Sequence, residues 1–319
     1  MRFPVLTALL AAVLAGPACA QPDAVDAGLQ TLWEALWHQS GTPTRLVRWE
    51  QGLKVRVHGD APAADRQRAL RALKEVAAVA GVPLADVSDR PDAERIANVD
   101  VEIVPDGALE DSQPCVTVLD FQDGMQIDDA RVQMRAGDAA RCAWHEAMHV
   151  MGIRGHPARG TVLSYFPGRV DGLLPLDRVL LQAWYSPRLH GGMTPFEVLP
   201  VLADQLVASL PPAQRAGASA ESARFLQRTI VQMRAFADGR GDVPAIVRRS
   251  GKATDEGVRY GRIEMCYFLG VAYLQGTAVP PDPDQAVRWL QRAASLGSPA
   301  AQVRLGAATA ARPRAAGAK

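Results

Sequence analysis

The sequence predicts an α+β fold, a mixed sheet with helices, followed by an all-α region, and three observations predict it. Strand-like and helix-like segments follow one another over residues 45–150 in the order β, α, β, β, β, α. Beyond Pro195 every segment has helical periodicity. The 319 residues are 48% hydrophobic and 22% charged, which is ordinary for a globular protein and excludes a mainly disordered chain.

The charge balance argues against nucleic acid as a partner. Thirty-five Lys and Arg stand against 34 Asp and Glu, so the chain lacks the basic excess that is typical of nucleic-acid-binding proteins. Four cysteines are too few at this length for a small disulfide-framework protein.

Residues 1–20 have the pattern of an export signal. One arginine precedes an apolar run over 5–15, which is shorter than the roughly 20 residues that a membrane-spanning helix needs. Ala18-Cys19-Ala20 then fits a cleavage site of the A-x-A type. We expect a signal peptide over 1–20, a periplasmic or secreted protein, and no membrane span in the mature chain. The alternative is a lipid anchor on Cys19, but the three residues before it form a poor lipobox.

The first part of the chain carries the strands of the expected sheet. Apolar residues spaced three and four apart predict helices, and alternating apolar and polar residues predict strands. Gln51-Gly52 is a turn signal, and Gly81 is typical of a helix end. In chain order we expect a helix over 24–39, a hairpin of 46–49 and 53–57, a helix over 63–80, and strands over 99–104, 116–121 and 130–136.

A further helix is expected over 138–152, with Asp138 as its N-cap and Gly152 as its C-cap. After a loop rich in Gly and Pro comes a helix over 176–185, and helical patterns continue beyond it. We expect two domains, a mixed domain over 21–200 and an α-helical domain over 201–319.

The helix over 138–152 carries two histidines and a glutamate whose spacing is typical of a metal site. His145 and His149 are four residues apart and project from one helix face, where two imidazoles can bind zinc. Glu146 lies beside that face and can act as general base on a water that zinc activates for attack on a carbonyl. The alternative is a pair of surface histidines on an amphipathic helix.

The third ligand has to come from beyond this helix. Gly152 accepts a positive φ, which allows a sharp turn that brings His156 back toward the metal. A fourth position then stays open for water, as a catalytic zinc requires. His190 is the alternative third ligand, whereas His38 and His58 are expected to have structural or solvated roles.

This segment resembles the metzincin clan of zinc metallopeptidases, whose pattern is H-E-x-x-H-x-x-G-x-x-H. The matching residues are His145, Glu146, His149 and Gly152. The third His of the pattern falls on residue 155, which is Gly, and His156 follows one position later. The resemblance covers about residues 45–190 and implies a zincin-like domain with Zn2+ as cofactor and peptide-bond hydrolysis as activity.

A second element of the resemblance lies downstream. Metzincins have a turn of the type S-[IV]-M-x-Y beneath the metal, and this chain has Thr161-Val162-Leu163-Ser164-Tyr165, with Leu in place of Met. Because Leu and Met have similar volumes, Leu163 can still place an apolar side chain beneath the site. The resemblance implies that Tyr165 stabilises an oxyanion and that the strand before the active helix, near 131–135, pairs with extended substrate. The alternative for Tyr165 is a packed loop aromatic.

Two cysteines flank the strands that precede the expected helix over 138–152. Export would allow Cys115 and Cys142 to form a disulfide, which would hold this helix against the sheet. The bond would contribute about 3–4 kcal/mol in the chain-entropy model. The alternative is a pair of buried free thiols, and a zinc-ligand role for Cys142 is disfavoured because three His candidates exist.

The C-terminal part has small residues at spacings that allow two antiparallel helices to pack closely. Leu269-Gly270 recurs as Leu305-Gly306, and Tyr273 and Trp289 would fill the gaps between the helices. This pattern resembles Sel-one-like repeats over about 262–310. The resemblance implies a surface for a protein partner, and the alternative is a helical cap on the first domain.

These features predict an exported zinc metalloendopeptidase that acts on a protein or peptide substrate. Glu146 and Tyr165 are the expected catalytic residues, and the expected zinc ligands are His145, His149 and His156. The alternative from another functional class is a non-catalytic protein with a zincin scaffold, which acts in protein–protein interaction through its helical repeat.

Overall fold

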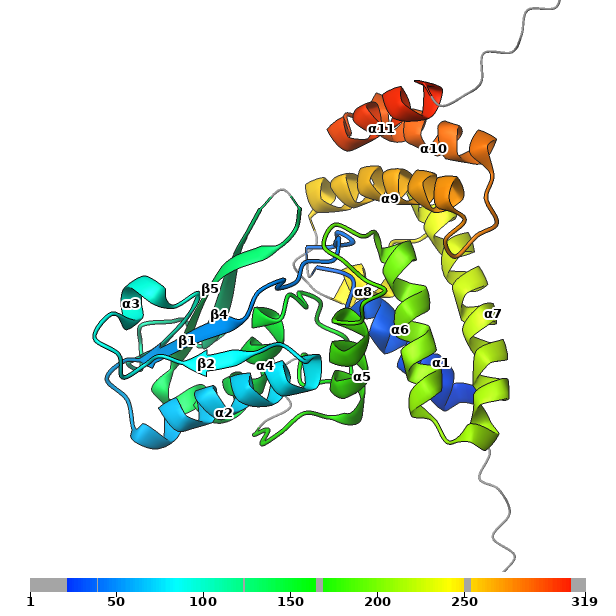
Figure 1. Cartoon of the computed structure of the whole chain (residues 1–319). Helices are drawn as coiled ribbons and strands as arrows, with labels where there is room; N and C mark the ends of the chain where they lie inside the picture. Colours follow the sequence, from blue (N-terminus) through cyan, green and yellow to red (C-terminus); the bar gives the residue numbers. More distant parts are fainter. Residues whose placement is uncertain (1–21, 39, 123, 165–168, 250–253, 311–319) are drawn as a thin grey trace, which may run out of the picture.

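A computed structural model describes the chain between residues 22 and 310, and Figure 1 shows its two parts. The described residues are 22–38, 40–122, 124–164, 169–249 and 254–310. The expected signal peptide over 1–20 lies outside them. A five-stranded sheet with two helices packed on it forms one part, and most of the remaining helices form the other.

The sheet is mixed, with one antiparallel strand at its edge. Its strands, in spatial order, are β2 (Leu84–Asp86), β1 (Leu53–His58), β3 (Val99–Val104), β5 (Ile127–Arg135) and β4 (Cys115–Phe121). The first four run parallel, whereas β4 runs antiparallel to β5. Val57, Val101 and Val132 stand in register on successive strands and are buried, which makes their face the core side of the sheet.

Helices α2 (Ala63–Ala80) and α4 (Ala139–Val150) pack against each other and against the sheet. α2 has the predicted bounds, and Gly81 ends it with a φ of 72°, the left-handed conformation that glycine adopts without strain. The indole Nε1 of Trp144 donates to Glu75 Oε2 at 2.7 Å, which links α4 to α2. These contacts fix the position of the helix that carries the two histidines.

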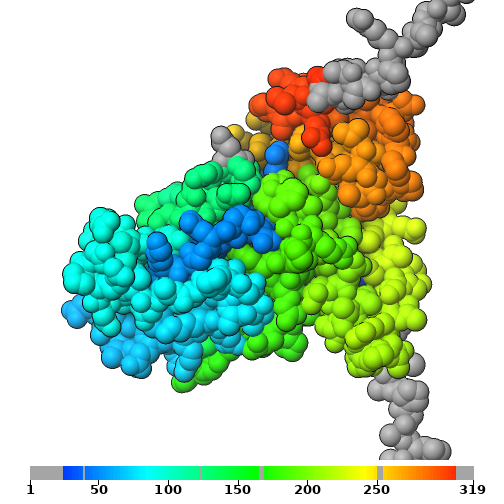
Figure 2. Space-filling view, in the orientation of Figure 1, coloured from blue at the N-terminus to red at the C-terminus, as the bar shows by residue number. Residues whose placement is uncertain are grey.

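The second part combines the first of the described helices with the C-terminal ones. Its members are α1 (Pro22–Glu34), α5 (Pro175–Trp184), α6 (Pro195–Ser209), α7 (Pro212–Ala237), α8 (Ala245–Arg249), α9 (Asp255–Gln275), α10 (Pro283–Ser295) and α11 (Pro299–Ala310). α1 packs against α6 and α7, where the Trp33 ring stacks on Phe196 with centroids 6.0 Å apart. Figure 2 shows α10 and α11, in orange and red, at the end of the molecule away from the cyan strands and helix.

The predicted domain boundary after residue 200 falls inside α6, which runs from Pro195 to Ser209 without a break. The buried apolar side chains of both parts belong to one continuous cluster. Neither observation separates the two parts, so the division into 21–200 and 201–319 stays a prediction.

The predicted hairpin of 46–49 and 53–57 is wrong. Both edges of β1 are occupied by the parallel neighbours β2 and β3, which leaves no edge for an antiparallel partner. Residues 46–49 instead run through the core, with three of their four side chains buried and a single bridge from Arg48 to Gln126. The structure also adds β2 and the short helix α3 (Ala93–Ile96), which are too short to show a periodic pattern.

The strand before α4 lies inside the sheet. β5 starts at Ile127, earlier than predicted, and pairs with β3 on one edge and β4 on the other. The expectation that 131–135 pairs with extended substrate is therefore wrong, because the backbone groups of β5 are already used on both sides. β4 is the edge strand next to α4, and no backbone hydrogen bond among the described residues reaches its outer edge.

Candidate metal centre

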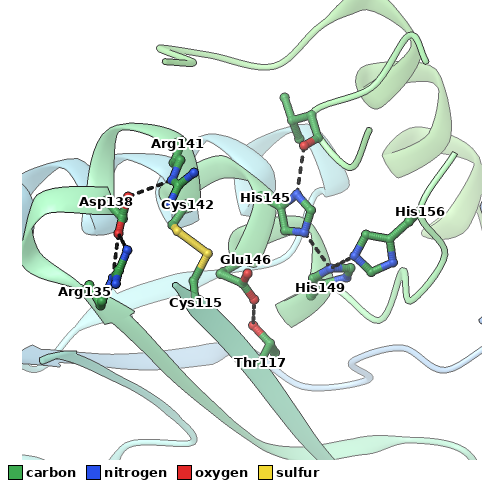
Figure 3. The surroundings of a disulfide bond; sticks show 11 residues. Cys115, Thr117, Arg135, Asp138, Arg141, Cys142, His145, Glu146, His149 and His156 are labelled. Atoms are coloured by element: carbon green, nitrogen blue, oxygen red, sulfur yellow. Dashed lines mark hydrogen bonds and ion pairs between the residues drawn. A yellow bond between two sulfur atoms is a disulfide. The ribbon is translucent and has the colours of Figure 1, made fainter. Parts of the chain in front are cut away.

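The structure brings three histidines to one point beside α4. His149 Nε2 lies 3.1 Å from His145 Nε2 and 3.2 Å from His156 Nε2, and Figure 3 shows the three rings turned toward one another. The two histidines of α4 are one helical turn apart, as their spacing predicts. His156 enters from the loop after the helix. These three residues form a group that can hold a metal ion.

Backbone carbonyls orient two of the rings. His145 Nδ1 lies 3.0 Å from Val162 O, and His149 Nδ1 lies 2.6 Å from Ile153 O. A carbonyl only accepts hydrogen bonds, so each Nδ1 carries the proton and donates it. Each Nε2 is then left with a lone pair directed at the common centre, which is the arrangement that orients histidine ligands of metals.

The rings of His145 and His149 are also held in the neutral state that a metal ligand requires. Burial lowers the pKa of His145 to about 4, and burial together with the neighbouring histidines lowers the pKa of His149 well below its ordinary value. Zinc–imidazole bonds of about 2.0–2.1 Å in tetrahedral geometry place ligand nitrogens about 3.3 Å apart. The separations of 3.1 and 3.2 Å from His149 to its two neighbours are close to this value, as expected for ligands of one metal ion.

Two glycines explain why the third histidine is residue 156. Gly152 has a φ of 89°, and a Cβ there would lie 2.2 Å from Val47 O. A Cβ on Gly155 would lie 2.4 Å from Ala35 O and 2.6 Å from Ala35 Cα. Since no side chain fits at 155 beside the end of α1, the histidine of this turn stands one position later than in the metzincin pattern.

Glu146 is buried next to the three rings and touches the edge strand. Thr117 Oγ1 of β4 donates to Glu146 Oε2 at 2.6 Å. Burial raises the pKa of Glu146 to about 7, and the hydrogen bond from Thr117 opposes this shift. A carboxyl group with this pKa can accept and release a proton near neutral pH, as a general base must.

A cleft of about 340 Å³ opens onto the histidines and Glu146. Its lining residues are His38, Ser112, Gln113, Cys115, Val116, Thr117, Leu119, Phe121, His145, Glu146, His149, Arg154 and His156. Most of β4 lies along this cleft. The arrangement therefore combines a metal-binding group, a proton acceptor and a strand edge in a single depression.

The turn over 161–164 lies beneath the site and is held by a buried carboxylate. Leu163 is fully buried and Val162 supplies the carbonyl that meets His145. Asp177, in the first turn of α5, accepts from Val162 N at 3.1 Å and from Leu174 N at 2.8 Å. Burial raises the pKa of Asp177 to about 7. Tyr165, the expected oxyanion donor, lies outside the described residues.

The disulfide between Cys115 and Cys142 is present, with Cα atoms 6.2 Å apart, so the alternative of two free thiols is wrong. It joins the start of β4 to α4 one turn before His145 (Figure 3). Asp138 occupies the predicted N-cap position of α4 without a capping hydrogen bond, because its carboxylate pairs with Arg135 and Arg141.

The other histidines lie at different places. His190 is exposed, and its Nδ1 contacts Gly191 O at 2.9 Å, outside the three-histidine group. His58 Nε2 lies 3.0 Å from Asp100 Oδ2 on the neighbouring strand, as a structural role implies. His38 lines the cleft, although its position at a helix end had suggested only a structural or solvated role.

Sequence reasoning missed Thr117 and Arg154, which both line the cleft. A signal for Thr117 was available: residues two apart in a strand share a face, so a strand whose Cys115 meets α4 also turns residue 117 toward that helix. Arg154 had no such signal, because the turn after Gly152 decides where its side chain goes.

In the C-terminal part, helices α9 and α10 pack through a glycine. A Cβ on Gly270 would lie 2.7 Å from Leu290 Cγ, so the small residue permits close helix packing. A family model described as Sel1 repeat matches residues 263–298, which confirms the predicted repeat. Sel1 repeats commonly mediate protein interactions.

The other comparisons found no relatives. No protease family model, no curated protein and no solved structure matches the chain. Within the described residues, the helices are too short or too polar for a membrane crossing.

Proposed function

We propose that this protein is an exported zinc-dependent metallopeptidase in which Glu146 is the general base. The observation that carries the proposal is the convergence of three histidine Nε2 atoms, beside a buried glutamate, in one cleft along an open strand edge. A mixed sheet with an antiparallel edge strand next to the histidine helix supports a zincin-like interpretation of the fold. The disulfide supports export, since such bonds persist in oxidising compartments.

In this proposal the chain's own residues hold the metal and move one proton. His145, His149 and His156 bind a zinc ion, which when present supplies Lewis acidity and lowers the pKa of a water molecule to about 7. Glu146 would accept a proton at Oε1, since Thr117 donates to Oε2, from the water that adds to the scissile carbonyl carbon. It would donate this proton to the amide nitrogen as the C–N bond breaks, which releases the amine.

The outer edge of β4 positions the substrate. An extended peptide can add to this edge as a further strand, with backbone hydrogen bonds that do not depend on its sequence. Thr117 lies on the same strand and contacts Glu146, so a peptide paired there passes the proton acceptor. β4 thus takes the role that was expected of residues 131–135.

The test is hydrolysis of a mixture of internally quenched peptides by the zinc-loaded protein and by Glu146→Gln. We expect the variant to keep its zinc and to lose at least about 100-fold in rate, because the proton acceptor is gone. Glu264→Gln, which changes a largely buried glutamate outside the cleft, is the matched control and should keep full activity. Full hydrolysis by Glu146→Gln would refute the mechanism.

A second function is favoured by the helical repeat. A cleft of about 660 Å³ on α10 is lined by Trp289, Arg288 and Arg292, together with Asp238 after α7. We propose that a protein partner binds there, and in the non-catalytic alternative this would be the protein's only activity. Crosslinking in cells should give a defined adduct that Arg288→Glu removes. An adduct that is unchanged in Arg288→Glu would exclude this surface.

A further inference from the structure

The cleft contains an arginine, Arg154, that pairs with no acidic group among the residues that the structure describes. Arg154 lies in the turn between His149 and His156 and lines the cleft. Among the described residues it has neither an ion pair nor a hydrogen bond, and its Nε is buried without a partner. Arg135, in contrast, pairs with Asp111 and Asp138. A half-buried cation without an anion costs stability, and a ligand that carries a negative charge would remove this cost.

The guanidinium lies over an aromatic ring. Its carbon lies 5.6 Å from the ring centroid of Phe121, the last residue of β4. Since Nε is buried, the side that remains for a ligand is the pair of Nη groups. Two parallel N–H groups of this kind match the two oxygens of a carboxylate.

The charges of the cleft favour an anion as well. Glu146 is the one acidic residue among the residues that line the described cleft, and Thr117 already donates to it. With a divalent cation on the histidines, the cleft would carry a net positive charge. A carboxylate on the peptide would restore the balance at the end of the cleft where Arg154 lies.

The direction of β4 says which part of the peptide reaches this arginine. Thr117 and Phe121 are four residues apart on the strand, which corresponds to about 13 Å. A peptide that pairs antiparallel to β4 places its N-terminal part opposite Phe121. A peptide that pairs parallel places its C-terminal part there.

We infer that Arg154, stacked on Phe121, binds a carboxylate of the peptide in the cleft, so that the protein selects acidic peptides. The inference rests on the proposed function only in taking a peptide as the ligand. The carboxylate has two possible sources, an Asp or Glu side chain and a free C-terminus. Antiparallel pairing allows only the side chain, whereas parallel pairing allows both.

The experiment measures binding, and hydrolysis is not needed for it. Zinc-loaded Glu146→Ala protein is immobilised and offered two matched pairs of heptapeptide mixtures, and retention is measured by mass spectrometry. One pair differs in Glu against Gln at one position with both ends blocked. The other differs in a free C-terminus against a C-terminal amide. The same measurement on zinc-free protein removes the contribution of the metal.

We expect the carboxylate form of at least one pair to bind about 10- to 100-fold more tightly, the range of a charge-assisted hydrogen-bonded pair. Arg154→Gln should reduce this ratio to about 1, and Arg154→Lys should keep part of it. Arg131→Gln is the matched control, because this exposed arginine pairs with Asp120 near the same strand end but does not line the cleft. It should keep the full ratio.

Phe121→Leu gives a second route if Arg154→Gln does not fold. Phe121 is partly exposed, so the change should leave the fold intact while it frees the guanidinium, and the ratio should fall severalfold. The inference is overturned if neither pair shows a preference in the parent protein, or if folded Arg154→Gln or Phe121→Leu keeps the full ratio. A preserved ratio in a protein that never hydrolyses peptides would refute the proposed function and leave this inference standing.

Discussion

The sheet part and the C-terminal repeat differ in what they bury. In one turn of α4 the chain buries His145 and Glu146, whose pKa values burial shifts to about 4 and about 7. Between α9 and α10 it buries small and apolar residues, with Leu290 packed over Gly270. The polar side chains of α10, including Arg288 and Arg292, instead surround an open cleft.

The difference in buried groups distinguishes a region suited to chemistry from a region suited to binding a partner. Burying a group that can carry charge costs stability, so a cluster of such groups in one cleft indicates that chemistry depends on them. A helix pair with an apolar interior needs no such cluster and offers an exposed face to a partner. We therefore expect the function of the sheet part to depend on single functional groups. The function of the repeat should depend mainly on how its helices pack.

The largest expected effect is on the turn that follows α4. Gly152→Ala places a Cβ 2.2 Å from Val47 O at a φ of 89°, so the backbone has to move. We expect a loss of more than about 3 kcal/mol in the free energy of unfolding, and weaker zinc binding because His156 moves too. Gly217 is an exposed residue of α7, and no atom lies within 4 Å of a Cβ built there. Gly217→Ala should therefore raise the free energy of unfolding by about 0.5–1 kcal/mol. Urea titrations compare both variants, and equal stabilities would contradict the comparison.

The disulfide should come next in size. Replacing Cys115 and Cys142 together by Ala removes a bond whose ends are 27 positions apart, and we expect a loss of about 3–4 kcal/mol. Zinc affinity should fall as well, because Cys142 and His145 share one turn of α4. Calorimetry and zinc titration measure the two effects. Cys266→Ala, a buried free thiol in the repeat, is the control and should leave zinc affinity unchanged.

A packing change in the repeat should act on that part alone. Leu290→Ala removes a fully buried side chain from the contact with Gly270, and we expect a loss of about 3 kcal/mol. Zinc affinity should remain that of the parent protein, since the metal group lies in the sheet part. A parallel loss of zinc would show that the two regions fold and function as one unit.

The smallest effect concerns Asp177. Its pKa is raised from 3.8 to about 7 by burial, so the folded state binds a proton that the unfolded state has already lost. Binding of this proton to Asp177 adds to the free energy of unfolding below about pH 4, and the added stability is lost as the pH rises to about 7. Arg178 opposes the shift and Glu75 adds to it. Asp177→Asn should make the decline in stability between pH 4 and 7 shallower. An unchanged slope in urea titrations would contradict the assignment.

The elements that could be predicted are those with local signals. The bounds of α2 follow from its apolar spacing and Gly81, and the convergence of His145 and His149 follows from their separation on a helix. The strand order could not be predicted, because it depends on pairings between distant segments. The predicted hairpin of 46–49 and 53–57 is wrong for this reason, because β1 pairs with β2 and β3 instead.

The candidate site shows the same limit. The sequence predicts His156 as the third histidine because Gly152 permits the turn. The reason for its exact position is the close approach of Gly155 to Ala35, which is far away in the chain. Thr117 and Arg154 reach the cleft from two further segments. No spacing rule connects these residues, so only the folded chain brings them together.

The most direct test of the account is the zinc content of the purified protein and of His156→Ala after reconstitution. The account predicts one zinc per chain in the parent protein, and its loss or marked weakening in His156→Ala, because one of three ligand nitrogens is removed. His190→Ala is the matched control and should keep the metal. No zinc in the parent protein, or zinc that His156→Ala holds equally well, would contradict the account.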